Sequence, residues 1–78
     1  MSVNNEISDV LILIGKNVKK YRLLKGIKQQ DLAYEMGNTD KSTISNIERF
    51  ACSGLNISTV VKICVVLEID IKALFEKI

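Results

Sequence analysis

The sequence lacks histidine and proline entirely, and only two of its 78 residues are cysteine. Cys52 and Cys64 stand 12 positions apart without a Cys-x-x-Cys motif. This inventory excludes a zinc site and a Cys–His nucleophile, so we expect no metal, no cofactor and no enzymatic activity. Disulfide-stabilised domains of this size usually carry more cysteines, which indicates two free thiols in a reducing cytoplasm.

Long hydrophobic runs are also absent. The longest, Val10 to Ile14, is far too short to cross a membrane, and no basic flank precedes it as in a signal peptide. With 47% hydrophobic and 26% charged residues, the composition is that of an ordinary globular protein. We therefore expect one domain over residues 1–78, located in the cytoplasm and without a membrane partner.

Charge is distributed unevenly along the chain. Residues 1–15 contain two anions and no cation, residues 16–49 contain eight Lys/Arg against four Asp/Glu, and residues 50–78 contain three of each. Six cations and no anion lie between Lys16 and Lys28. A basic segment favours a polyanionic partner, although a lysine-rich helix face is more often only a solvated surface.

Apolar residues recur at helical spacing near the start of the chain. Ile7, Leu11, Ile14, Val18 and Tyr21 are separated by four, three, four and three positions, the period of one amphipathic helix face. Turn and capping residues predict the other boundaries: Gly26, Gly37, Thr39 or Asp40, Asn56 and Asp70. We expect five helices and no strands, at about 5–25, 29–36, 41–49, 57–67 and 71–77.

Two of these segments fit a helix-turn-helix pattern, QQDLAYEMG followed by NTDKSTISNIER. Ala33 is small enough to let the two helices approach, and Gly37 can adopt the positive φ that a tight turn requires. Ile44 and Ile47 are the large apolar residues of the second segment, and its other positions are almost all hydrogen-bonding groups. The polar face is therefore available to enter a major groove.

From Ile14 to Phe75 the chain resembles the Cro and phage-repressor type of helix-turn-helix regulators, the XRE family. The likeness is carried by IGKNVKKYRLLKGIKQQDLA, STISNIER and STVVKICVVLEIDIKALF. It implies an all-α, five-helix lambda repressor-like bundle in which helices two and three form the helix-turn-helix. It also implies a sequence-specific double-stranded DNA-binding transcriptional regulator, of repressor or restriction–modification controller type, acting as a homodimer on a two-fold operator.

The resemblance further implies an ion pair between Arg22 and Glu48, with two separate surface charges as the alternative. Some positions depart from the family pattern. The interval from Gly37 to Ile44 is one residue longer than usual, and polar Asn38 follows the turn glycine. The other departures are Phe50 in place of a glycine, a loop after it that is about one residue longer, Lys28 in place of a Ser or Thr cap, and Glu68 in place of a small residue.

DNA contacts divide into those that position the protein and those that read bases. Lysine can donate to guanine, asparagine can pair with adenine, and a threonine methyl can meet a thymine methyl. By resemblance, Gln29 reaches a phosphate oxygen. The expected phosphate contacts are Gln29, Lys28, Asn38, Ser45 and Arg49, and the expected base contacts are Lys41, Ser42, Thr43 and Asn46. Alternatively, Ser42 and Thr43 are only first-turn residues of their helix and contact no base. The surface that attracts DNA either includes the lysines of the first helix or leaves them as a solvent-exposed face: Lys16, Lys19, Lys20 and Lys25.

Segment 57–67 is more apolar than one core face requires, with Lys62 nearly alone as a polar residue. Such a helix is either central or covered by another chain, and we predict a two-fold dimer. The predicted interface residues are Val61, Val65, Phe50, Phe75 and Ile78. A similar apolar excess at Val10, Ile12 and Leu13 predicts a second contact or a fold-back of the N-terminus.

Two other classes of function stay open at this stage. An antitoxin-like module would bind a toxin or another protein, with DNA binding secondary or absent. An enzyme is the weakest alternative, because Asp31, Glu35 and Asp40 have no accompanying nucleophile, metal set or phosphate loop, and carboxylates near helix starts are usually caps.

Overall fold

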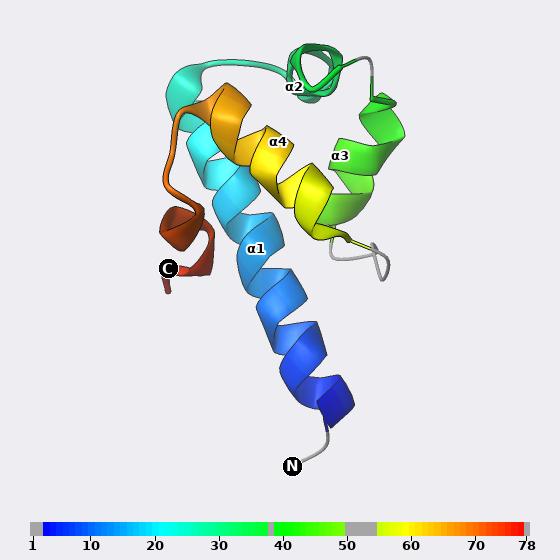
Figure 1. Cartoon of the computed structure of the whole chain (residues 1–78), viewed down its shortest axis with the longest axis vertical. Coiled ribbons are helices and arrows are strands. Elements are labelled where there is room, and N and C mark those ends of the chain that lie inside the picture. The colour runs from blue at the N-terminus through cyan, green and yellow to red at the C-terminus, as the bar shows by residue number, and fades with distance from the viewer. Residues whose placement is uncertain (1–2, 38, 50–54, 78) are drawn as a thin grey trace.

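The computed structural model describes residues 3–37, 39–49 and 55–77, which form four α-helices and one 3₁₀ helix (Figure 1). The elements are α1 (Val3–Lys25), α2 (Gln29–Glu35), α3 (Lys41–Glu48), α4 (Ile57–Leu67) and η1 (Ile71–Phe75). No strand occurs in these three ranges, so the all-α class is confirmed for them.

The expected count of five α-helices is not confirmed in the described residues. The segment expected at 71–77 forms the five-residue 3₁₀ helix η1, held by i to i+3 bonds such as that from the Ala73 N–H to the Asp70 carbonyl at 2.9 Å. One turn of α-helix fixes several residues for a single hydrogen bond, so short terminal segments commonly take the tighter form.

Most of the helix ends lie where the turn and capping residues predict. Asp40, Asn56 and Asp70 accept hydrogen bonds from the backbone N–H groups of residues 42, 59 and 72 at 3.0, 2.9 and 3.0 Å. Gly26 and Gly37 have φ angles of +77° and +102°, which an L side chain rarely adopts. The sequence predictions for these five residues are confirmed.

Two departures from the family pattern also have structural counterparts. The Lys28 side chain makes no cap bond, and its backbone N–H instead donates to the Asp31 carboxylate at 3.4 Å. Glu68 ends α4 with a φ of +58°, in the left-handed region where glycine is usual. Its carboxylate lies 2.8 Å from Lys25 Nζ, a contact that ties the end of α4 to the end of α1.

One core lies between the four α-helices and η1. Asn17 is buried at its edge and donates from Nδ2 to the carbonyls of Leu74 and Glu76, both at 2.8 Å, which fixes η1 against α1. Burying these amide hydrogens costs little because both find acceptors. The largest fully buried apolar side chains are Leu32, Ile44, Ile63, Leu74 and Val18.

The outer face of α4 carries an apolar stripe, which we define as Ile57, Val61 and Val65. These residues lie four positions apart and are 68%, 47% and 69% exposed. Phe75 on η1 is also exposed, whereas the interface candidates Phe50 and Ile78 lie outside the described residues. Within the described ranges, no helix has both the length and the apolar character needed to cross a bilayer.

Candidate nucleic-acid interface

Helices α2 and α3 form a closely packed pair joined by a short turn. Ala33 on α2 is 1% exposed, and its carbonyl accepts a hydrogen bond at 2.9 Å from the N–H of Thr39, after the turn. Ile44 and Ile47 of α3 are buried against this unit. A small residue at position 33 is therefore required by the close approach, as the sequence pattern predicts.

The opposite face of α3 is polar. At 100° per residue, Ser42, Asn46 and Arg49 lie on the side away from buried Ile44 and Ile47, and all three are exposed. Thr43 and Ser45 are half-buried on the two flanks. Ser42, Asn46 and Arg49 therefore stand clear of the bundle, whereas Thr43 and Ser45 border them.

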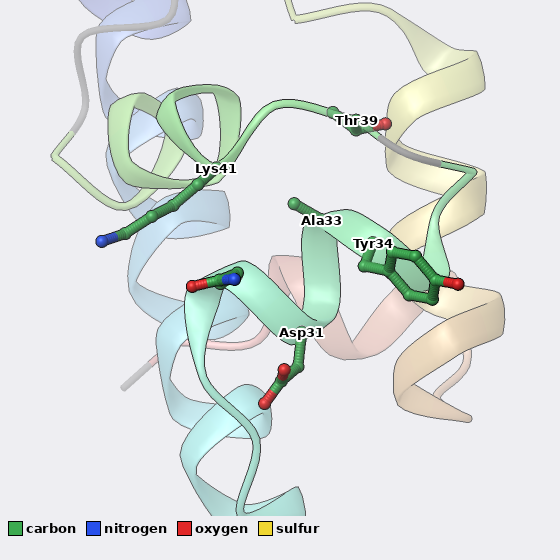
Figure 2. Close-up of a pocket in the computed structure, with 6 residues that line it drawn as sticks. Asp31, Ala33, Tyr34, Thr39 and Lys41 are labelled. Carbon is green, nitrogen blue, oxygen red and sulfur yellow. The ribbon is translucent and has the colours of Figure 1, made fainter.

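Lys41 lies at the start of α3, beside a shallow hollow that extends to α2. Gln30, Asp31, Ala33, Tyr34 and Thr39 line the rest of this hollow. Figure 2 shows Lys41 and Tyr34 on opposite sides, with the lysine side chain extending away from the tyrosine. Tyr34 is an exposed aromatic side chain and is not among the contact residues that the sequence predicts. No motif or spacing in the sequence indicates it.

A buried network joins three helices beneath this surface. The Arg22 guanidinium on α1 donates to both oxygens of Glu48 on α3, from Nε at 2.8 Å and from Nη2 at 3.1 Å. Arg22 Nη1 donates to the Ile27 carbonyl at 2.8 Å. The alternative of two separate surface charges is therefore wrong, because the two side chains are only 9% and 3% exposed.

Gln29, expected at a phosphate, belongs to the same network. Its Nε2 donates to Glu48 Oε1 at 3.1 Å, across 19 residues of sequence. The amide has a second N–H, and the side chain is only half-buried. One carboxylate thus fixes both the arginine of α1 and the first residue of α2, an arrangement that the spacing of the sequence did not reveal.

The cations of the basic segment differ in their surroundings. Lys28, Lys41 and Arg49 are exposed around the α2–α3 unit, whereas Lys25 is paired with Glu68. That hydrogen bond from Lys25 lowers the pKa of the Glu68 carboxyl, and so does the nearby ammonium charge. Lys20 Nζ lies 5.0 Å from the centre of the Tyr21 ring. Asn38, the remaining phosphate candidate, lies outside the described residues.

The cysteine at position 64 is part of the core rather than of a reactive site. Burial, followed by the charge of Asp70, raises the pKa of its thiol above the ordinary value, which keeps it protonated and unreactive. Cys52 lies outside the described residues.

Comparison with known proteins agrees with this geometry. Residues 18–74 match the helix-turn-helix family model. The fold is similar to the crystal structure of the restriction–modification controller protein C.AhdI from Aeromonas hydrophila, with 28% identity and a TM-score of 0.77 over 83% of this chain and 96% of that one. No curated protein sequence matches the chain. The resemblance to Cro-type regulators is confirmed, and the chain belongs to the helix-turn-helix family.

Proposed function

We propose that the protein is a sequence-specific double-stranded DNA-binding transcriptional regulator, of repressor or restriction–modification controller type. The observation that carries this proposal is the polar outer face of α3, where Ser42, Asn46 and Arg49 are exposed while Ile44 and Ile47 anchor the helix. Similarity to a restriction–modification controller supports the same function. An α-helix with such a face fits the width of a major groove.

In this proposal α3 reads bases and its surroundings hold the backbone. Asn46 pairs with adenine, Lys41 donates to guanine, and Ser42 and Thr43 contribute at the start of the helix. Arg49, Lys28, Ser45, Asn38 and Gln29 contact phosphates. Gln29 is suited to this role because Glu48 fixes its side chain while one N–H is left to donate.

The regulator acts as a homodimer on a two-fold operator. One module of this size contacts few base pairs, and paired modules reach half-sites about 34 Å apart. The apolar stripe on α4 supports the pairing, since three exposed residues in one row are costly to leave in water. Exposed Phe75 extends the proposed interface. Phe50 and Ile78 are included in it because the sequence analysis predicts them there.

Base reading is tested by fluorescence anisotropy with a DNA fragment from upstream of the protein's own coding sequence. We expect Asn46→Ala and Lys41→Ala each to weaken binding about fivefold or more, because a good base contact contributes about 1–3 kcal/mol of discrimination. Lys77→Ala removes the same type of exposed side chain from the C-terminal segment and should leave affinity unchanged. Unchanged binding in both α3 variants contradicts the base-reading assignment.

Phosphate contacts are tested by the salt dependence of the same binding. Arg49→Ala and Lys28→Ala should weaken binding to specific and unrelated duplexes alike, and each should reduce the slope of log K against log salt by about one. A wild-type affinity that does not change with salt contradicts DNA binding altogether. An antitoxin-like role, in which a different protein covers the stripe, would then replace the regulator.

Dimerisation through α4 is tested by analytical ultracentrifugation. Val65→Glu places a charge in the proposed interface, so we expect the α4-mediated dimer to dissociate. Val65 is exposed in the single chain, and the variant should therefore keep its helical circular dichroism. Self-association equal to that of the wild type contradicts this interface.

A further inference from the structure

The N-terminal half of α1 reaches beyond the other helices. At 1.5 Å per residue, the 23 residues of α1 span about 35 Å, and Figure 1 shows its first turns projecting away from the bundle. The family match begins only at residue 18, so most of this helix precedes the matched domain. The hydrogen bonds from α1 to α3 come from Arg22, near the other end of the helix.

One side of this helix carries two apolar residues between opposite charges. Asp9, Ile12, Leu13 and Lys16 line a single shallow hollow, which Lys77 borders from the C-terminal segment. Lys16 and Asp9 are exposed, and Ile12 and Leu13 are half-exposed. Neither charged residue forms an ion pair within the part of the chain that the structure describes.

The pattern is self-complementary. The point midway between Ile12 and Leu13 is also midway between Asp9 and Lys16, which lie about 5 Å from it along the helix axis. An antiparallel copy of the helix, related by a two-fold axis at this point, places Ile12 opposite Leu13 and each Asp9 opposite Lys16 of the other copy. Such a closed, isologous contact satisfies both charges and covers both apolar residues.

We propose that α1 pairs with α1 of a second copy of this chain, antiparallel and centred between Ile12 and Leu13. Helix geometry places this face on the side of α1 opposite buried Val18, away from the core. The pairing uses a different helix from the apolar stripe of α4 and does not depend on DNA binding. A dimer formed through α4 leaves both of its α1 faces free to pair with other chains. Where both contacts form, they therefore join dimers into larger assemblies.

The test is the average mass at sedimentation equilibrium, at low salt and over a range of concentrations. Lys16→Glu turns both attractive Asp9–Lys16 contacts into repulsive ones, so we expect this association to weaken about tenfold or more. Asp9→Lys should have the same effect. Lys28→Glu makes the same charge change at an exposed position of the α2 end and should leave the mass unchanged.

Mixing gives the decisive result. Equal amounts of Asp9→Lys and Lys16→Glu chains restore opposite charges at both contacts, so the mixture should regain the wild-type mass although neither variant forms the α1 pairing alone. Circular dichroism should show both variants folded, because both residues are exposed. Wild-type mass in Lys16→Glu, or no recovery in the mixture, overturns the α1 pairing. These outcomes are independent of Val65→Glu, which reports on α4, and of the DNA-binding experiments.

Discussion

Replacing Glu48 by alanine removes the carboxylate that joins α1, α2 and α3. Arg22 then retains only the Ile27 carbonyl among its three acceptors and keeps its charge in a site where its side chain is 9% exposed. Breaking a buried ion pair from one side costs about 3–5 kcal/mol. A chain of 78 residues has a total free energy of unfolding of about 4–12 kcal/mol. We therefore expect Glu48→Ala to lose about a quarter or more of the stability.

Urea unfolding followed by circular dichroism at 25 °C measures this loss. The double variant Arg22→Met/Glu48→Leu removes both charges and fills the site with apolar atoms, so it should be more stable than Glu48→Ala by about 2 kcal/mol. It should still bind DNA less tightly than the wild type, because Gln29 loses its acceptor. Lys25→Ala, which breaks the exposed pair with Glu68, is the matched control and should have a much smaller effect. A loss below about 1 kcal/mol in Glu48→Ala would refute the reasoning.

Other parts of the structure give three further predictions. Ala33→Leu should destabilise by about 1–3 kcal/mol and weaken DNA binding, since the side chain is buried where α2 and α3 meet; wild-type urea stability would contradict this. Asn56→Ala should cost about 1 kcal/mol by the same assay, because the bond to the Thr59 N–H caps α4, whereas Asn56→Asp should cost little. The hydrogen bond from Tyr21 to Glu76, then burial and the carboxylate charge, raise the pKa of Tyr21 above its ordinary value near 10. The stabilisation from this hydrogen bond is therefore present below pH 10 and is lost as the pH rises through the pKa of Tyr21 in the folded chain. The wild type should lose stability relative to Tyr21→Phe only at alkaline pH. A difference in thermal midpoint between the two chains that does not change with pH would exclude this coupling of tyrosine ionisation to folding.

The sequence predicts the helices best where local chemistry sets their ends. The range 57–67 is reproduced residue for residue, because Asn56 caps its start and the apolar pattern stops at Leu67. The start of α1 lies at Val3 rather than near Asn5. The last predicted helix, at about 71–77, is the shorter 3₁₀ helix η1, since seven residues contain too few periods to separate an α-helix from a 3₁₀ helix.

The candidate site, too, could be predicted from the sequence only in part. The exposed polar face of α3 follows from residue type and spacing alone, because Ile44 and Ile47 leave only one side outward. The bonds from Gln29 to Glu48 and from Lys25 to Glu68 span 19 and 43 residues. They depend on how the helices pack, and neither residue type nor periodicity indicates such distant partners.

The two faces of α3 have a consequence for how a regulator of this kind diversifies. Its inward residues fix the helix, whereas Ser42 and Asn46 contribute little to folding because they are exposed. Surface substitutions of this kind usually change stability by less than about 0.5 kcal/mol. After a gene duplication, one copy can therefore drift at these positions and acquire a new target while its scaffold stays intact.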